Sequence, residues 1–144
     1  MTSPIRVLGS VSYWVIEDPV EIRRFINTNV RREWESDTLD SDKEAGLDLW
    51  LQRLSDKRWQ LQIIELDRIR LNPRIMNYKN ESGYNFRDRI KQRSGKLHRD
   101  IRDYGAVIWP LVVDKEMILR DGYCRYHALR ELGVSIAYAY VTLV

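Results

Sequence analysis

The sequence has little cysteine, histidine or proline, and it has no long apolar run. Its 144 residues include one cysteine, two histidines and four prolines. A single cysteine allows no internal disulfide, which is typical of proteins in a reducing cytoplasm. Two histidines and one cysteine at unrelated spacings contain no zinc-ligand pattern, so we expect no metal site built from side chains. No apolar run approaches the roughly 20 residues of a membrane span, and the N-terminus lacks the layout of a signal peptide. We therefore expect a cytoplasmic protein with no membrane partner.

An excess of charge of one sign is also missing. The chain has 24 Lys and Arg residues against 21 Asp and Glu residues, which leaves a net charge of +3. So small an excess is weak support for a polyanionic partner. The chain is 44% hydrophobic and 31% charged, which indicates a globular protein with one core. Five tryptophans and eight tyrosines are many for this length, and we expect most of them in the core or in pocket walls.

The first 57 residues are interpreted as a mostly helical portion without a chemical motif. Residues 11–16, VSYWVI, predict a short strand. Asp18-Pro19 predicts the N-cap and first position of a helix that continues through EIRRFINTN. A capping box and a helical apolar pattern predict a second helix over 41–54. We expect residues 1–57 to be a helical N-terminal extension and residues 58–144 to be the core, within one compact unit.

From Trp59 onward, strand and helix patterns alternate. WQLQIIEL alternates in polarity and is rich in β-branched residues, while the segment that follows it is loop-like. Phe86, Ile90, Leu97, Ile101 and Tyr104 recur at helical spacing until Gly105. The pattern predicts an α/β or α+β fold, with a mixed sheet and helices. The elements expected are a strand at 59–66, a helix at 86–104, strands at 107–113 and 117–119, a helix at 125–132 closed by Gly133, and a strand at 135–143. Within the 107–113 strand, Pro110 indicates an edge position or a bulge.

The segment RDGYCRYHALRELG, residues 120–133, places an Asp-Gly step between a strand and a helix. We expect the strand that ends at Leu119 to run into a helix that begins within a residue or two of Gly122. The first N–H groups of such a helix have no intrahelical partners, and the positive end of the helix dipole favours anions there. Gly122 would let a ligand approach closely, and Arg125 could add a bidentate contact to phosphate oxygens. The alternative is a turn that only caps a helix.

The motifs around this turn resemble the ParB/sulfiredoxin superfamily over residues from about 60 to 144. A helix ending at Gly105 leads to Pro110-Leu-Val-Val, and a second strand then delivers Asp-Gly-x-x-Arg at a helix start. In that superfamily the turn binds nucleotide phosphates, so the resemblance implies a ParB/sulfiredoxin-like fold and a nucleotide ligand: ATP, ADP or CTP, with or without Mg²⁺. The phosphate-binding candidates are Gly122, Tyr123, Cys124, Arg125 and His127, of which the last could instead fill a polar edge.

Individual residues separate the branches of this superfamily. Sulfiredoxins attack with a cysteine directly after the motif glycine, and this chain has Tyr123 there. Cys124 comes one residue later and is expected to point elsewhere around the helix. ParB proteins carry a further G-E-R-R type box and a helix-turn-helix region, so a complete ParB centromere binder is not expected. The nearest resemblance is to free serine kinases, through Ile64-Glu65-Leu66-Asp67, Trp109 and the Asp-Gly-x-x-Arg motif.

The catalytic glutamate of those kinases has no counterpart in this chain, which has Asn72-Pro73-Arg74 at the corresponding place. Glu81 is a substitute carboxylate that could serve as a base, or it could be a solvated loop residue. Asp121 could act beside a Mg²⁺ ion carried by the nucleotide. The leading hypothesis is therefore a small nucleotide-dependent phosphotransferase or NTP hydrolase, with an unknown small-molecule phosphate acceptor. Its alternatives are a DNA-associated accessory protein of plasmid or phage type and a catalytically inactive interaction module.

The helix expected at 86–104 carries an excess of basic residues. Arg89, Arg93 and Lys96 are its candidate contacts to nucleic-acid phosphates. A mixed-charge amphipathic helix is more commonly a solvated face. DNA therefore stays the partner of the alternative hypothesis, and we expect binding to duplex DNA to be weak.

Overall fold

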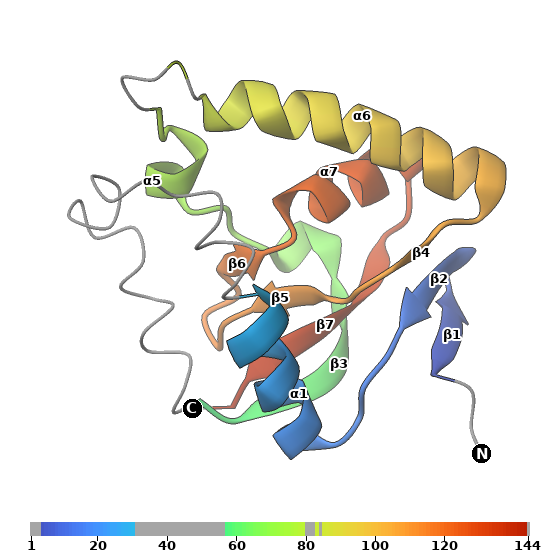
Figure 1. Ribbon diagram of the computed structural model, residues 1–144, viewed down its shortest axis with the longest axis vertical. Coiled ribbons are helices and arrows are strands. Elements are labelled where there is room, and N and C mark those ends of the chain that lie inside the picture. The colour runs from blue at the N-terminus through green and yellow to red at the C-terminus, as the bar shows by residue number, and fades with distance from the viewer. Residues whose placement is uncertain (1–3, 31–56, 80–82, 84, 144) are drawn as a thin grey trace.

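Two β-sheets make the framework of the computed structural model, which describes residues 4–30, 57–79, 83 and 85–143 (Figure 1). The smaller sheet has the order β1-β2-β4, and the larger has the order β3-β7-β5-β6. In the larger sheet β7 runs antiparallel to β3 and parallel to β5, while β6 is antiparallel to β5. The strands are β1 (Ile5–Leu8), β2 (Val11–Trp14), β3 (Trp59–Glu65), β4 (Val107–Ile108), β5 (Leu111–Val113), β6 (Leu119–Asp121) and β7 (Ile136–Thr142). The mixed α+β class predicted from the sequence is confirmed.

The helices begin and end at the capping residues that the sequence provides. Asp18 accepts hydrogen bonds from the backbone N–H groups of residues 20 and 21, and Asn85 caps the long helix in the same way. That helix ends at Gly105, whose φ of 64° is left-handed, a conformation that costs glycine little. The helices are α1 (Pro19–Phe25) with its π-helical continuation η1 (Ile26–Val30), η2 (Leu66–Arg68), α5 (Pro73–Met76), α6 (Phe86–Tyr104) and α7 (Tyr123–Leu132).

The larger sheet is covered on both faces (Figure 1). On one face, α1 and η1 bury an apolar cluster against it, made of Ile22, Ile26, Val30, Trp59, Val112 and Tyr140. On the other face α7 packs on the strands, and α6 lies across α7. Residues of opposite parity along β5 therefore enter different clusters, as the two-residue period of a strand requires.

The N-terminal segment is part of the same packed unit and contributes strands as well as helix. Val11, Tyr13 and Val15 belong to the main apolar cluster. The strand expected at 11–16 is β2, but β1 precedes it and pairs with it as a hairpin. The described part of the segment, residues 4–30, is thus less helical than expected, because the alternating residues of the hairpin serve a second, smaller sheet. The helix predicted at 41–54 lies outside the described residues.

The segment 107–113 forms two strands rather than one. β4 pairs with β2 in the smaller sheet, whereas β5 pairs with both β6 and β7 in the larger. Pro110 stands between the two, at the point where the chain passes from one sheet to the other. The expected edge position was wrong, since β5 is an interior strand; the irregular register lies two residues later, at Val112 and Val113. Proline suits this junction because it has no N–H to leave unpaired.

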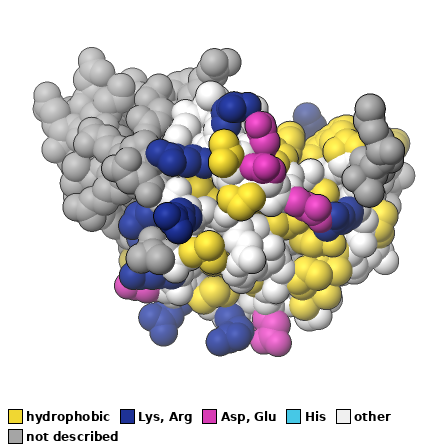
Figure 2. Space-filling view, turned by 90° about the horizontal axis from the view of Figure 1, so that it is seen from below, with side chains coloured by type: hydrophobic (Ala, Val, Ile, Leu, Met, Phe, Trp, Pro, Cys, Tyr) yellow, Lys and Arg dark blue, Asp and Glu magenta, His cyan; other side chains and the backbone are white. Residues whose placement is uncertain are grey.

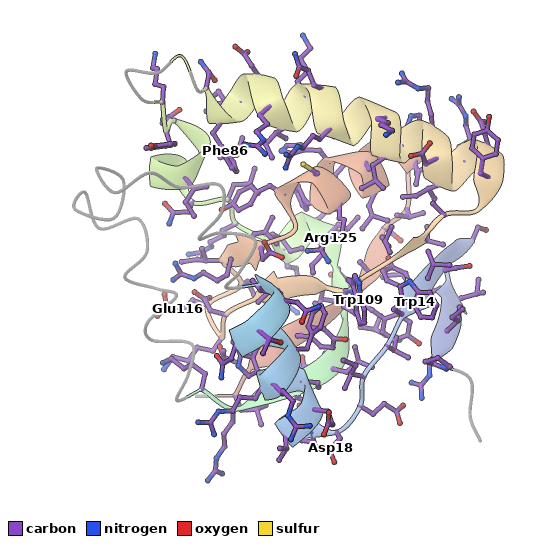
Figure 3. All side chains as sticks on the ribbon, in the orientation of Figure 1. Trp14, Asp18, Phe86, Trp109, Glu116 and Arg125 are labelled. Carbon is purple, nitrogen blue, oxygen red and sulfur yellow. The ribbon has the colours of Figure 1, made fainter. Side chains whose placement is uncertain are left out.

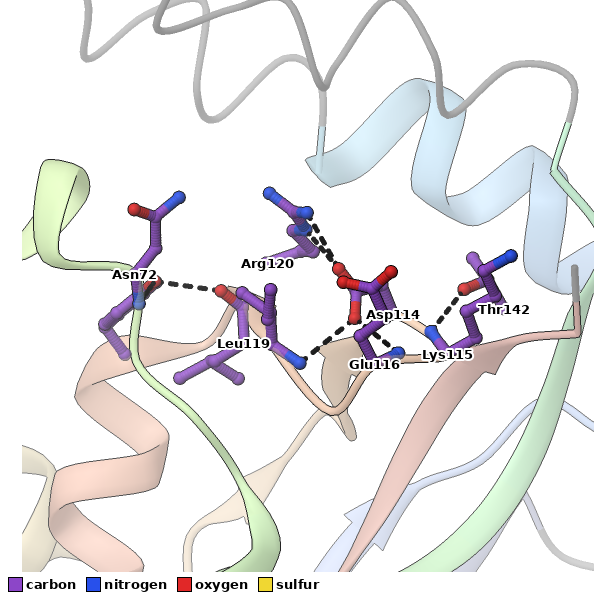
Figure 4. Close-up of polar contacts among 9 residues, drawn as sticks. Asn72, Asp114, Lys115, Glu116, Leu119, Arg120 and Thr142 are labelled. Carbon is purple, nitrogen blue, oxygen red and sulfur yellow. Dashed lines mark hydrogen bonds and ion pairs between the residues drawn. The ribbon is translucent and has the colours of Figure 1, made fainter.

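The turn that leads into β6 is held by one carboxylate (Figure 4). Asp114 accepts hydrogen bonds from the backbone N–H groups of Glu116 and Ile118, at 2.8 and 3.0 Å, and from the side chain of Arg120. An aspartate that bonds the backbone two and four residues ahead closes a tight turn. This turn sets where β6 starts, and thereby where α7 begins.

The surface mixes apolar and charged side chains. Figure 2 shows hydrophobic side chains gathered on one side of the face in view, with most of the Lys and Arg side chains in view on the other. Tyr104, the last apolar residue of the helical pattern, is 84% exposed and takes no part in the core. Within the part of the chain that the structure describes, no helix combines the length and the apolar character needed to cross a membrane.

Candidate functional site

The helix after Gly122 begins where the sequence predicts, whereas the strand before it lies two residues later than the expected 117–119, because Met117 has a left-handed φ of 66° in the preceding turn. β6 ends at Asp121 and α7 begins at Tyr123. The first backbone hydrogen bond of the helix runs from the N–H of Tyr126 to the carbonyl of Gly122, at 2.8 Å. No side chain caps this helix start among the described residues. The N–H groups of residues 123–125 thus precede the first helical bond, which is the arrangement that favours an anion.

Arg125 is held by acceptors within the protein (Figure 3). Its Nη1 donates to the carbonyl oxygens of Trp109 and Pro110, at 2.9 and 2.7 Å, and its Nη2 donates to Asp121 at 2.7 Å. The two side chains of the ion pair are only 18% and 11% exposed. The guanidinium thus ties the junction between β4 and β5 to the end of β6. The structure gives this arginine a structural task that the motif alone did not indicate.

Gly122 is required by its backbone and by its neighbours. Its φ of 97° is left-handed, which residues with a Cβ adopt only at a cost. A Cβ at this position would lie 2.9 Å from Nη2 of Arg125 and 2.9 Å from Cδ2 of Leu111. The group that comes close to Gly122 is therefore the guanidinium of Arg125, whereas the sequence analysis expected a ligand there.

Tyr123 and His127 point away from the start of α7. Tyr123 is 3% exposed, and its hydroxyl donates to the carbonyl of Leu119 at 2.8 Å while accepting from the N–H of Asn72. Only the backbone of Tyr123 is therefore available to a ligand. His127 packs against Tyr126 with ring centroids 5.2 Å apart. Its Nε2 is buried without a hydrogen-bond partner among the described residues, and burial lowers the pKa of its imidazole below the ordinary 6.5.

A cavity of about 800 Å³ opens at the start of α7. Four parts of the chain form its walls, and each lies in a different region of the sequence. These are α1 with η1, α6, the β4–β5 junction, and the turn from β6 into α7. The residues that line the cavity are Phe25, Asn29, Val30, Arg93, Lys96, Leu97, Asp100, Ile108, Trp109, Asp121, Cys124 and Arg125. His127 and Arg89 are not among them, because successive helical residues point about 100° apart and only one face of each helix reaches the cavity.

Two of the three basic candidates on α6 face this cavity, namely Arg93 and Lys96. The ammonium of Lys96 is exposed, and none of the ion pairs between described residues involves it. The cationic side of α6 and the helix start of α7 were separate features in the sequence. The fold brings them to one cavity, so they can act on one ligand.

Cys124 lines the cavity, whereas Tyr123, which has the position of the sulfiredoxin cysteine, is buried beside Leu119 and Asn72. The two side chains therefore point in different directions, as the spacing along the helix predicts. The thiol is half-buried. Burial raises the pKa of the Cys124 thiol above its ordinary 9.0, although Arg93 and Arg125 oppose this shift. Since the thiolate is the nucleophilic form, the environment does not activate this cysteine as a sulfiredoxin-type nucleophile requires.

Two groups of residues remain: a sequence candidate that lies outside the described residues, and cavity residues that the sequence patterns missed. Glu81 belongs to the first group. Phe25, Asn29 and Asp100 belong to the second, because nothing in a single sequence shows that α1 and α6 meet at the start of α7. Among the described residues, no cluster of three or more His, Cys, Asp or Glu side chains could hold a metal ion.

No family model and no curated protein matches the sequence. Among solved structures, two of the N-domain of a pNOB8-like ParB are similar in fold, with TM-scores of 0.43 and 0.41 at 15% and 16% identity, each over 58% of this chain. The matched part spans less than a third of those chains, 29% and 27%. Sulfiredoxin from Arabidopsis thaliana is similar with a TM-score of 0.40 and 20% identity, over 57% of this chain and 83% of that chain. ParB and sulfiredoxin are the two kinds of protein that the motifs resemble, and both are among these similar structures.

Proposed function

We propose that this chain binds a nucleotide in the cavity at the start of α7. One observation carries the proposal: a single cavity of about 800 Å³ joins an uncapped helix start, two cationic side chains of α6 and a pair of aromatic rings. Ligand sites of this kind are concave, mostly apolar and provided with a few convergent polar groups, and they typically measure about 300–1,000 Å³. Phosphates and a planar base meet these two requirements in one molecule.

The phosphates lie at the start of α7 in this proposal, with Lys96 as their main charged contact. Arg125 already donates to three protein acceptors, so it shapes the site rather than binding freely. Lys96 forms no ion pair with another described residue, and an ammonium is a common phosphate ligand. Arg93 lies one turn before it on the same face of α6 and adds positive charge. The proposal thus keeps the phosphate site expected from the sequence, but assigns its main positive charge to Lys96 of α6 in place of Arg125 of α7.

The chemical step proposed is phosphoryl transfer or NTP hydrolysis. Asp100 and Asp121 are the carboxylates that line the cavity among the described residues. Asp121 is paired with Arg125, so Asp100 is the better candidate to accept a proton from the attacking hydroxyl or water. Mg²⁺–nucleotide complexes are usually held by one or two carboxylates, and Asp100 and Asp121 are the candidates for that role in this proposal. The ion would supply charge neutralisation at the phosphates.

The test is calorimetric titration of ATP, ADP and CTP, with and without Mg²⁺, into the wild type and two lysine variants. Lys96→Ala should weaken binding about tenfold or more, because a hydrogen bond to a charged group contributes about 1.5–3 kcal/mol. Lys91→Ala is the matched control, since Lys91 is exposed on the same helix and does not line the cavity. It should leave the affinity unchanged. Wild-type affinity in Lys96→Ala, or no binding of any nucleotide to the folded wild type, would refute the proposal.

A further inference from the structure

The cavity has an aromatic wall, one side of which comes from the N-terminal segment, outside the region that resembles the superfamily. Phe25, at the end of α1, stacks on Trp109 with ring centroids 4.3 Å apart and planes 30° apart. Trp14 of β2 lies beyond Trp109, at 6.3 Å and 34° (Figure 3). Phe25 and Trp109 are both partly exposed and both line the cavity. The pair therefore offers ring surface to a ligand instead of being wholly used in the core.

The helix that carries Phe25 changes its winding at the cavity. α1 continues without a break into the π-helical turn η1, and π-helical turns are rare and occur often at functional sites. In η1, Ile26 and Val30 are buried against the larger sheet, at 0% and 3% exposure, whereas the exposed Asn29 faces the cavity. The core thus fixes the position of this turn, which presents Asn29 to the cavity with its Oδ1 accepting from the hydroxyl of Thr28 at 2.8 Å.

The aromatic wall is also fixed relative to the helix start of α7. Arg125 donates to the carbonyl oxygen of Trp109 itself and to that of the next residue, while it pairs with Asp121 at the end of β6. Trp109 in turn contacts Phe25. A ligand that places its phosphates at α7 thus meets these rings at a defined distance and orientation.

From these contacts we infer that α1 and η1 are the specificity element of the site: they select ligands in which the phosphate is joined to a planar ring. This inference rests on the proposed nucleotide function and adds the part of the ligand that the N-terminal segment recognises. Phe25 and Trp109 contact the flat ring of the ligand, and the amide of Asn29 contacts its polar edge. Phosphates that lack a planar ring, such as tripolyphosphate or ribose 5-phosphate, bind at the same helix start without this contribution.

The experiment compares ATP with tripolyphosphate and ribose 5-phosphate, in the wild type and in two variants of α1. Phe25→Leu keeps an apolar side chain of similar size but removes the aromatic face, and Val20→Ala is the control because Val20 is 65% exposed and does not line the cavity. We expect Phe25→Leu to weaken ATP about tenfold, in line with about 1–3 kcal/mol per stacked base, and to leave tripolyphosphate unchanged. Val20→Ala should alter neither. Circular dichroism confirms that each variant is folded.

Tryptophan fluorescence gives a second readout that a change in stability would not produce. ATP should quench the emission of the wild type more than tripolyphosphate does. In Trp109→Phe that extra quenching should disappear while the affinity for ATP stays within about twofold, since phenylalanine also stacks on bases.

Three results would overturn the inference. If tripolyphosphate binds the wild type as tightly as ATP, or if Phe25→Leu weakens the binding of both ligands equally, α1 and η1 do not recognise a planar ring. The proposed phosphate site would survive either of these. If neither ATP nor tripolyphosphate binds, both proposals fail together.

Discussion

Arg125 belongs to a motif that predicts phosphate binding, but in the structure its side chain holds parts of the protein together. All its assigned donor contacts end on protein acceptors: the two carbonyl oxygens of the β4–β5 junction and the carboxylate of Asp121. The ion pair with Asp121 is largely shielded from water, where the loss of a hydrogen-bonded charge is costly. The arginine therefore contributes to stability first, and to the site through the geometry that it maintains.

Replacing Arg125 by Ala should lower the free energy of unfolding by about 3 kcal/mol, because it removes the cationic partner of a buried carboxylate. Urea unfolding followed by circular dichroism measures this change. The control is Arg130→Ala, which breaks the exposed pair between Arg130 and Asp67 and should be close to neutral. Equal effects of the two substitutions would contradict the structural role of Arg125.

Two glycines of this chain should respond to alanine in opposite directions. Gly122→Ala should destabilise the protein by about 2 kcal/mol, since it combines a left-handed φ with contacts of 2.9 Å. Gly95 lies in the interior of α6, and a Cβ there would meet nothing within 4 Å. Gly95→Ala should therefore stabilise the protein by about 0.5–1 kcal/mol. Thermal unfolding of both variants checks the two signs, and a stabilising Gly122→Ala would mean that the turn is built differently.

At the scale of elements, α6 has two roles that its sequence presented as one. Its apolar residues pack on α7 and the core, with Phe86, Ile90 and Ile101 buried. Its basic residues divide between the cavity, reached by Arg93 and Lys96, and the outer surface. Cations that line a cavity suit a small anion, whereas a row along the outside of a helix suits a duplex backbone.

We expect α6 to bind duplex DNA only weakly. The expected slope of log K against log salt is shallow, because few phosphates are neutralised, and it should be the same in the Arg93→Ala, Lys96→Ala double variant. Fluorescence anisotropy over a salt series measures the slope, and the same double variant should lose nucleotide binding. A steep slope that falls by about two in the double variant would favour the DNA-associated class over the nucleotide enzyme.

At the scale of the whole molecule, three tyrosines from different elements are buried in one packed unit. Burial raises the pKa of Tyr123 from its ordinary 10.0 to about 12 and the pKa of Tyr140 likewise to about 12. Burial also raises the pKa of Tyr13, although a hydrogen bond and Arg125 oppose the shift. Between pH 10 and 12 the folded protein therefore keeps phenolic protons that the unfolded chain has lost.

Stability should accordingly be unaffected by these groups below about pH 10 and should fall as the pH rises from 10 toward 12, because the unfolded state binds fewer protons in that range. Urea unfolding at pH 9, 10 and 11 tests the expectation. Tyr140→Phe should reduce the pH dependence, and Tyr104→Phe should not, since Tyr104 is 84% exposed. A flat stability profile to pH 11 would show that the phenols ionise within the fold.

Local patterns in the sequence determined the elements and the turn. Asn85 and Gly105 mark the two ends of α6, the Asp-Gly step marks the passage from β6 to α7, and the alternation of residues 59–65 and 136–142 marks two strands. Each of these depends on capping, on glycine's backbone freedom or on the period of a strand, and all three act within a few residues. These elements can therefore be predicted from the local sequence, without knowing what they pack against.

Only the tertiary structure decided which of these elements meet. The chain passes from one sheet to the other at Pro110, α1 turns Phe25 toward Trp109, and Lys96 faces the same cavity as Cys124. These contacts join residues that are far apart in the sequence, and they depend on how apolar faces pack in three dimensions. The strand-to-helix turn could thus be expected from six residues of motif, but the cations and aromatic rings that share its cavity, and the structural use of Arg125, come from packing.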